Sequence, residues 1–506
     1  MRGDLDPLTR RRRLELGALA AVVAAAAGLR FLALDRQPGG LYPDEAAEGY
    51  DAHLLVHLFP RFHPVFFQDD AGREALYGYL VAIAFRLAGE STTVLRATSA
   101  TLGVLAVIAV YGWLRRRGAA TALGGAAWTA GSLWLVSISR DGMRNVLVPV
   151  TGTLALWAMS AWAEKPTRNR ALLAGAAMAL GLWTYQPLKL LPVLLVAWLL
   201  WLRARDRETW RTLRPYLGWV SLAYLVVGAP MLFTAVTDTG HYFGRAVAVT
   251  AGSQAASGTG LLDHTVRTLL MFAFTGDPNQ RHDVSGLPML GVPLTLLAGL
   301  GAWGAWQRRS EPFESLVLVS LPVFLVPPLV ATADAAPHFL RSLGLAAPLA
   351  ALVGLGVAET IRISRGVLPA TAVATGLGLL LAALGAGTAG AYFGRPVTAR
   401  YDAYSYNLVQ LASLAQTADL NILLIDDYQA TDIRFLDADA VASRRVRIAD
   451  PVVRDSAPSH PQGATCAVLA LSQAAIRQAY GDGLAAAAIP VATDPAGGPS
   501  VWRATC

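Results

Sequence analysis

Long apolar runs separated by short polar loops constrain the fold of this chain more than any other feature. A helix needs roughly 20 mostly apolar residues to cross the hydrocarbon core of a bilayer. Eleven runs of this length or slightly shorter cover residues 14–34, 93–114, 119–138, 145–163, 171–186, 188–202, 215–235, 288–306, 313–331, 339–359 and 367–391. The sequence therefore predicts an all-α polytopic membrane bundle with these eleven transmembrane helices.

The charge content agrees with a membrane protein. Charged residues make up 15% of the chain and hydrophobic residues 54%, whereas soluble domains carry about 25% charged residues. The net charge of +7 could indicate nucleic acid binding, but the arginines form short clusters between the apolar runs and no single basic face. We therefore expect no nucleic acid partner and attribute the clusters to membrane orientation.

The basic clusters predict how the helices are oriented. Lys and Arg in short loops are retained on the cytoplasmic side of a membrane. With a cytoplasmic N-terminus, that side collects the clusters at 10–13, 115–117, 165–170, 203–214, 308–309 and 362–365. The apolar run 75–89 is too short to span and holds Arg86, so it predicts a juxtamembrane or re-entrant helix. We expect a multi-pass cell-membrane protein whose outward segments are 35–92, 139–144, 236–287, 332–338 and everything from 392 onward.

The residues after Tyr392 differ from the rest of the chain in composition. Helical patterns at 403–416 and 473–480 and a Gly/Pro/Asp loop at 493–499 alternate with short β-rich runs at 421–425, 445–448, 465–471 and 501–505. The pattern predicts a membrane domain over 1–391 followed by a small extracytoplasmic α/β domain over 392–506. Its two cysteines, Cys466 and Cys506, leave one disulfide or two unpaired thiols open.

An acidic pair, Asp44 and Glu45, follows the first apolar run. One interpretation is structural, because Asp44 could cap a helix that begins near Ala46. The other is catalytic. A carboxylate at the lip of an apolar bundle is partly desolvated, which raises its basicity and suits it to take a proton from a hydroxyl.

A second polar group lies between Gln68 and Tyr77 and contains Asp69, Asp70, Arg73 and Glu74. These residues either cap the short apolar helix and anchor its tyrosines at the interface, or contribute to a substrate site. Both interpretations stay open.

Several cations fall in outward loops, against the orientation trend. They are Arg140 and Arg144 in a short loop, Lys189 shortly after Tyr185, and Arg341 shortly after His338. Singly, each could anchor lipid headgroups; together they predict an anion site for a phosphate, whose oxygens match the guanidinium fork.

The long outward loop ends in a turn-rich segment, Thr275 to Pro288. Arg281 and His282 could reach a substrate from it. His282 could also bind a metal with Asp277 or Asp283, but no spacing here is diagnostic, so we assign no metal or other cofactor and leave a divalent metal open.

In this arrangement the chain resembles the GT-C superfamily of membrane glycosyltransferases, in particular bacterial relatives of the protein O-mannosyltransferases and of the aminoarabinose transferase that acts on lipid A. The resemblance covers roughly residues 14–391. It is carried by Asp44-Glu45, by Arg73-Glu74-Ala75-Leu76-Tyr77 leading into Leu95-Arg96, and by Ser139-Arg140 with Arg144, Tyr185 to Lys189, Gly276 to Asn279 with Arg281-His282, and Pro337-His338 with Arg341.

The resemblance implies a sugar donor on a polyprenyl phosphate, transfer with inversion, and a lipid, glycan or protein acceptor. Asp44 would be the base or acceptor-orienting group, and Glu45 a supporting carboxylate. Donor phosphate would bind Arg140, Arg144, Lys189 and Arg341, and substrate would contact Arg73, Glu74, Tyr185, Arg281, His282 and His338. The chain departs from the O-mannosyltransferases at Arg73-Glu74-Ala75 and in its tail. These departures argue against a protein as the acceptor.

The chemistry of such a donor fits the residue inventory. A glycosidase needs two carboxylates because its leaving alkoxide must be protonated. A polyprenyl phosphate leaves as a stable anion, so one base with nearby cations should suffice. The alternatives are a transporter or flippase of lipid-linked or anionic solutes, which would need polar groups at the midplane, and a membrane anchor for the tail.

Overall fold

The computed structural model describes residues 7–68, 72–251, 261–284, 286–331, 335–415, 419–452 and 465–505. Eight helical segments within these ranges are long and apolar enough to cross a membrane. They are Arg10–Phe31, Thr92–Arg117, Arg144–Glu164, Gln186–Arg205, Arg207–Thr237, Pro312–Val330, Leu343–Ile363 and Ala370–Phe393. Their helices are α1 (Pro7–Phe31), α4 (Thr92–Leu114), α7 (Leu147–Glu164), α9 (Leu191–Arg205), α10 (Arg207–Leu213), α11 (Leu217–Thr237), α15 (Pro312–Val330), α16 (Ala346–Ile363) and α17 (Ala370–Phe393). Each of the eight segments corresponds to one predicted span, although α10 itself lies between the predicted spans 188–202 and 215–235.

The other three predicted spans form shorter helices. Run 119–138 is divided at Ser132 into α5 (Ala119–Gly131) and α6 (Leu133–Ile138), run 171–186 contains α8 (Arg168–Leu180), and run 288–306 contains α14 (Gly291–Gln307). Glycine lets these helices approach their neighbours closely. A Cβ on Gly354 of α16 would lie only 2.2 Å from the Thr121 carbonyl of α5, and one on Gly301 of α14 only 2.0 Å from the Leu352 carbonyl of α16.

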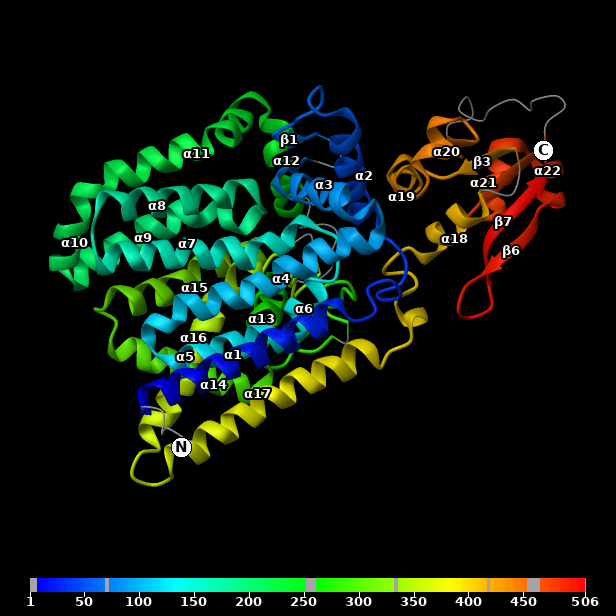
Figure 1. Ribbon diagram of the computed structural model, residues 1–506. Helices are drawn as coiled ribbons and strands as arrows, with labels where there is room; N and C mark the ends of the chain where they lie inside the picture. Colours follow the sequence, from blue (N-terminus) through cyan, green and yellow to red (C-terminus); the bar gives the residue numbers. More distant parts are fainter. Residues whose placement is uncertain are drawn as a thin grey trace, which may run out of the picture.

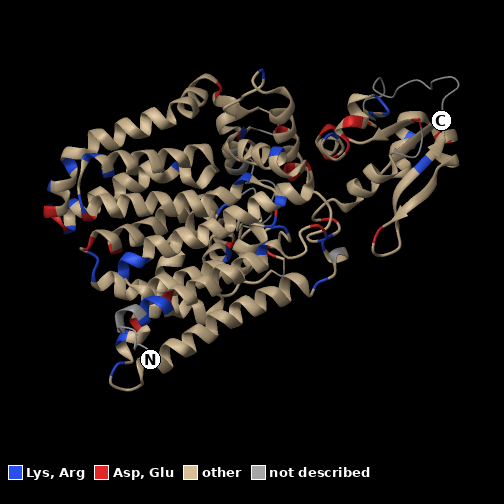
Figure 2. Cartoon of the chain, viewed as in Figure 1, with Lys and Arg blue, Asp and Glu red and all other residues tan. Residues whose placement is uncertain are grey.

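The basic clusters gather at one end of the bundle, at the left in Figure 2, around α10 and the ends of α4 and α9. The C-terminal domain lies at the other end (Figure 1). This segregation agrees with the predicted orientation, whose cytoplasmic and outer sides stay a prediction.

A cap of short helices and one strand pair covers the end of the bundle next to the C-terminal domain (Figure 1). It consists of α2 (Pro43–Leu58), the antiparallel pair β1 (Phe66–Phe67) and β2 (Arg73–Glu74), α3 (Leu76–Ala88), α12 (Thr239–Ala251) and α13 (Leu261–Leu270). The short run 75–89 forms α3, which packs against α2 and α4 through Tyr77, Val81 and Phe85. Arg73 and Glu74 lie in β2 just before the helix they were expected to open.

The start of α2 corrects one expectation. The helix begins at Pro43 with Tyr42 as the N-cap, so Asp44 lies in the first turn and does not cap a helix beginning at Ala46. Proline at the first helical position explains this start, since its fixed φ suits a helix and its missing N–H is not needed there.

The C-terminal domain is an α/β domain, as predicted. Its helices are α18 (Tyr406–Leu414), α19 (Asp427–Leu436), α20 (Ala438–Ala442), α21 (Gln473–Tyr480) and α22 (Asp482–Ala487), and its strands are β3 (Leu420–Leu424), β4 (Val446–Ala449), β5 (Cys466–Ala470), β6 (Ile489–Thr493) and β7 (Pro499–Thr505). The strand order is β4-β3-β5-β7-β6; β3 is parallel to β4 and β5, and β7 is antiparallel to β5 and β6. Cys466 is disulfide-bonded, and Cys506 lies outside the described residues.

Helix α19 docks the C-terminal domain onto the cap (Figure 1). Its Phe435 ring stacks on Phe85 of α3, with centroids 6.1 Å apart. The same ring lies against Gly49 of α2, where a Cβ would be 2.7 Å from Phe435. This contact brings α19 over the helix that carries Asp44 and Glu45.

Candidate active site

Asp44 lies at the junction of the membrane domain and the C-terminal domain. It is 6% exposed, and the Tyr428 hydroxyl of α19 donates a 2.7 Å hydrogen bond to its Oδ1. Tyr428 also packs edge-on against Tyr42, with ring centroids 6.4 Å apart. The first turn of α2 places Asp44 where the helix dipole favours a negative charge.

Two cavities flank Tyr428 between α2 and α19. One, of 200 Å³, is lined by Tyr42, Pro43 and residues of the C-terminal domain. The other, of 290 Å³, is lined by Tyr50, Asp51 and Arg73 on the membrane-domain side. Both are lined by Pro43, which precedes Asp44, and by Tyr428, which is hydrogen-bonded to it.

Asp432 of α19 is buried one turn beyond Tyr428 and makes no hydrogen bond from its side chain among the described residues. Burial, with the charges of Glu45 and Asp44, raises its pKa to about 9. This carboxyl is therefore protonated at neutral pH, beside two acidic residues of α2.

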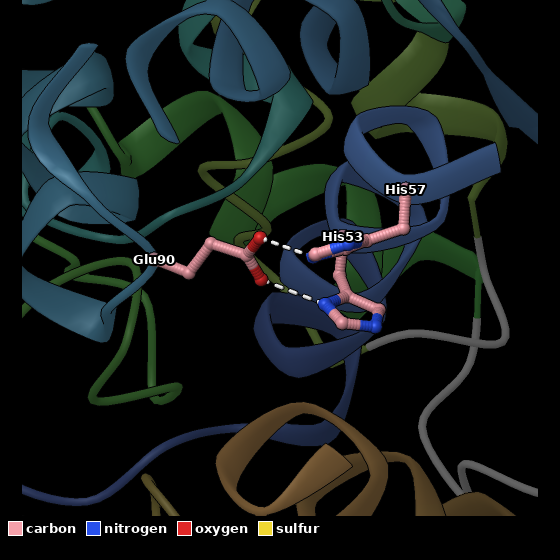
Figure 3. Close-up of side chains that lie close together, drawn as sticks. All are labelled: His53, His57 and Glu90. Carbon is pink, nitrogen blue, oxygen red and sulfur yellow. Dashed lines mark hydrogen bonds and ion pairs between the residues drawn. The ribbon is translucent and has the colours of Figure 1, made fainter. Parts of the chain in front are cut away.

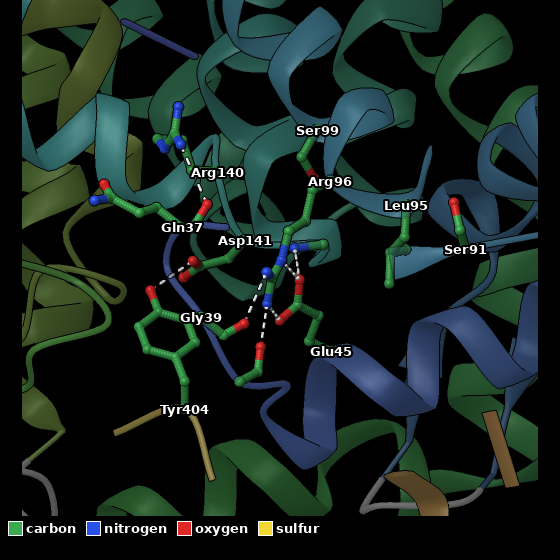
Figure 4. A network of polar contacts seen from close by, with 12 residues as sticks. Gln37, Gly39, Glu45, Ser91, Leu95, Arg96, Ser99, Arg140, Asp141 and Tyr404 are labelled. Atoms are coloured by element: carbon green, nitrogen blue, oxygen red, sulfur yellow. Dashed lines mark hydrogen bonds and ion pairs between the residues drawn. The ribbon is translucent and has the colours of Figure 1, made fainter. Parts of the chain in front are cut away.

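Glu45 is fully buried and paired with Arg96 of α4 (Figure 4). The Arg96 guanidinium donates to both carboxylate oxygens, at 2.7 and 2.8 Å, and to the carbonyls of Gly39 and Gly40. The backbone N–H of Gly142 also donates to Glu45, at 2.8 Å. These bonds hold the loop before α2, helix α4 and the 139–144 loop together, which favours a positioning role for Glu45.

Asp141 adjoins this network and accepts a 2.7 Å hydrogen bond from the Tyr404 hydroxyl, as Figure 4 shows. Burial, with the charge of Glu45, raises the pKa of Asp141 to about 7. Through Tyr404 the C-terminal segment makes a second polar contact with the membrane domain.

Arg140 is fully buried and donates to main-chain carbonyls. Its acceptors are Leu29, Arg30, Leu32 and Gln37, at 2.8 to 3.2 Å. Its guanidinium also lies over the rings of Tyr392 and Phe393, at the end of α17. These contacts tie the end of α1 to α17 and favour a structural role over the expected phosphate binding.

The other predicted cations form a connected cluster around Glu74. Arg144 and Lys189 each contact the Glu74 carboxylate at 3.1 Å. Arg144 also contacts Glu48 of α2 at 2.7 Å. Burial acts to raise the pKa of Glu74, but the charges of Lys189 and Arg144 outweigh it and hold that pKa below its usual value.

Tyr185 joins Arg341 to this cluster. The Arg341 guanidinium donates to the Tyr185 hydroxyl at 2.8 Å, and the Arg144 guanidinium lies 5.7 Å from the Tyr185 ring centroid. Arg144, Lys189 and Arg341, from three separate segments, are therefore brought together, and the first of them is bound to the helix of Asp44. Arg73 forms a separate buried ion pair with Asp51 at 2.6 Å.

Asp277, His282 and His338 form one group with the composition of a metal site. His282 Nδ1 lies 3.0 Å from Asp277 Oδ2, the two histidine rings are 4.9 Å apart, and all three ligand atoms lie within 4.8 Å of one another. The Asp277 carboxylate also accepts the N–H of Phe339 at 2.6 Å. An Asp and two imidazoles suit a zinc-like ion, although the hydrogen bonds alone also account for the arrangement.

Arg281 lies at the start of α2, the helix that carries Asp44 and Glu45. Its guanidinium carbon is 3.3 Å from the Tyr42 ring centroid. Asp69 and Asp70, which were grouped with Arg73 and Glu74, lie outside the described residues.

Sequence reasoning assigned no role to Glu48, Asp51, Asp141, Tyr404 or Tyr428, which the structure brings into the site. Helical spacing could have indicated Glu48 and Asp51, because residues 44, 48 and 51 lie on one face of a helix. No local signal pointed to Tyr428.

Known proteins resemble this chain in part of its sequence and in its fold. Residues 74–233 match the family model described as dolichyl-phosphate-mannose-protein mannosyltransferase. No curated protein matches the sequence. Among solved structures, ArnT from Cupriavidus metallidurans bound to undecaprenyl phosphate aligns over 97% of this chain and 98% of its own, with 14% identity and a TM-score of 0.61.

The archaeal oligosaccharyltransferase AglB from Archaeoglobus fulgidus, solved with an inhibitory peptide and a dolichol-phosphate, also aligns. The alignment covers 98% of this chain and 74% of AglB, with 13% identity and a TM-score of 0.55. The chain therefore has the fold of ArnT and AglB, which confirms the GT-C architecture predicted from the sequence.

Proposed function

We propose that the protein is a membrane glycosyltransferase that moves a sugar from a polyprenyl-phosphate donor to a hydroxyl or phosphate acceptor at the capped end of the bundle. The observation that carries this proposal is on α2. Asp44 and Glu48 are one turn apart on the helix, and Glu48 binds Arg144, the centre of the cationic cluster. Helix α2 thus carries the base for the acceptor and, through Glu48, contacts the cations for the donor phosphate.

In this reaction the Asp44 carboxylate takes the proton of the acceptor hydroxyl. The acceptor oxygen forms a bond to the anomeric carbon as the bond from that carbon to the phosphate oxygen breaks, and the phosphate leaves with the electron pair. Arg144, Lys189 and Arg341 stabilise the phosphate charge. A single displacement of this kind inverts the anomeric carbon.

Glu74 supports this assignment of the cations. Together with Glu48 it neutralises Arg144 and Lys189 in the absence of donor, so that two cations are buried without uncompensated charge. Donor phosphate would share these cations, since guanidinium and ammonium groups each have several N–H donors.

The acceptor enters from the cavities lined by Tyr428, whose hydroxyl binds Asp44, and one of these cavities is also lined by Asp51 and Arg73. In this proposal Glu45 and Arg140 hold the site together and do not touch substrate. Fold likeness to ArnT and AglB and the partial match to the mannosyltransferase model support a lipid-linked donor.

Incubating the purified protein with radiolabelled polyprenyl-phosphate sugars and membrane extract tests the proposal. Label should appear in an acceptor fraction with the wild type and be lost with Asp44→Asn, while donor binding is retained. Asp35→Asn, at an exposed position in the same segment, is the matched control. Absence of transfer from every polyprenyl-phosphate donor would contradict the proposal.

A further inference from the structure

A second polar cluster lies on α2, about 14 Å along the helix from Asp44 at 1.5 Å per residue. It consists of His53 and His57, one turn apart on the helix, and Glu90, which follows α3 (Figure 3). The three side chains are between 22% and 55% exposed. The cluster is therefore separate from the proposed catalytic site.

The three side chains converge on one point. His53 Nδ1 lies 2.7 Å from one Glu90 oxygen and His57 Nε2 lies 2.8 Å from the other. The imidazole rings are 4.4 Å apart, and all three ligand atoms lie within 4.8 Å of one another. Tyr50 stacks on His53 with the rings 12° from parallel, which holds that imidazole in place.

This donor set matches zinc-like divalent ions. Two imidazoles at positions i and i+4 of one helix and a carboxylate from a neighbouring segment supply three ligands of a tetrahedral site. Bonds of about 2 Å to a tetrahedral ion place the ligand atoms roughly 3.3 Å apart. The nitrogen–oxygen contacts of 2.7 and 2.8 Å are shorter than this, so the carboxylate moves away from the imidazoles when the ion binds, and the exposed side leaves the fourth position to water.

We propose that His53, His57 and Glu90 form a divalent transition-metal site of the zinc class. The ion joins the last turns of α2 to the connection between α3 and α4, because its ligands come from both. It thereby fixes the helix that carries Asp44, without contact to the reacting groups. This site is distinct from the buried group of Asp277, His282 and His338.

Zinc binding to the full-length, metal-stripped protein in detergent tests the site. Bound Zn²⁺ per chain is measured by elemental analysis after gel filtration, and Co²⁺ absorption in the visible range reports the coordination. The double variant His53→Ala/His57→Ala should bind one equivalent less than the wild type. His63→Ala, which removes an exposed histidine bonded to the Pro60 carbonyl, should bind the same amount as the wild type.

Glu90→Gln guards against a folding defect, because it keeps the size of the side chain and removes its charge. It should also lose the equivalent while retaining the gel-filtration profile. Unchanged Zn²⁺ stoichiometry in both variants would overturn the proposal and leave a His–Glu ion pair only. Asp277→Asn, in the second group, is the control for the origin of the signal. It should leave the Co²⁺ spectrum of the His53, His57 and Glu90 site unaltered.

Discussion

The Tyr428 hydroxyl donates a hydrogen bond to Asp44, although the two residues are 384 positions apart in the chain. The bond joins the C-terminal domain to the first turn of α2 and helps to keep Asp44 only 6% exposed. Any acceptor that reaches Asp44 must therefore share this place with Tyr428. The relationship gives the C-terminal domain a part in the site, and it leads to the first prediction.

Tyr428→Phe should loosen the docking of α19 on α2. The change removes one donor from a carboxylate, and a hydrogen bond to a charged group is worth about 1.5–3 kcal/mol. We expect faster hydrogen exchange in α2 and α19, measured by mass spectrometry, while the rest of the bundle is unchanged. Tyr216→Phe, at the opposite end of the bundle, is the control. Equal exchange in wild type and Tyr428→Phe would mean that the bond contributes nothing to docking.

Docking should also depend on pH through Asp432. Its folded pKa, about 9, lies above its unfolded value of 3.8, so the folded protein binds the extra proton between these values. Stability from this group is present below pH 3.8 and is lost as the pH rises through 9. Protease cleavage between the domains should therefore increase from pH 7 to pH 10 in the wild type.

Asp432→Asn should remove this dependence, because an amide of the same shape never ionises. The comparison at pH 7, where both side chains are neutral, is the internal control. Cleavage that rises equally with pH in both proteins would assign the effect to another group.

Much of the membrane domain could be predicted from the sequence, and the reason is physical. Bilayer thickness fixes the length of an apolar helix, so the run 93–114 coincides with α4 to within a residue. Runs such as 119–138 were less regular, because close glycine contacts and a break at Ser132 divide them into shorter helices.

The site was only partly predictable, as Arg140 illustrates. An arginine in an outward loop suggested a phosphate ligand, but its acceptors include carbonyls at the end of α1, where a helix has no internal donors left. Arg30 does the same for the carbonyls of Thr129 and Ala130 at the end of α5. Such contacts depend on which helix ends lie next to each other in the fold. The local sequence around an arginine does not predict this.

The Glu45–Arg96 pair should matter for stability more than for chemistry. Both groups are buried, and removing one leaves the other charge uncompensated, which costs about 3–5 kcal/mol. Glu45→Gln should therefore lower the thermal midpoint in detergent. Glu45→Gln/Arg96→Met should recover part of that loss, since neither charge then remains. If Glu45→Gln abolished transfer at an unaltered thermal midpoint, Glu45 would instead belong to the reacting groups.

Arg341 and Arg140 should separate phosphate binding from structure. Arg341 lies in the cationic cluster through Tyr185, so Arg341→Gln should weaken binding of polyprenyl phosphate by about 10- to 100-fold, the loss of one or two charge-assisted hydrogen bonds. The folded Arg341→Gln protein should keep its thermal midpoint within a few degrees.

Arg140→Gln should instead lower the thermal midpoint and leave the affinity for polyprenyl phosphate unchanged, because it leaves four main-chain carbonyls without their donor. Titration of the lipid phosphate by calorimetry, alongside thermal unfolding of both variants, checks the contrast. A large loss of affinity in Arg140→Gln at unchanged stability would return Arg140 to the donor site.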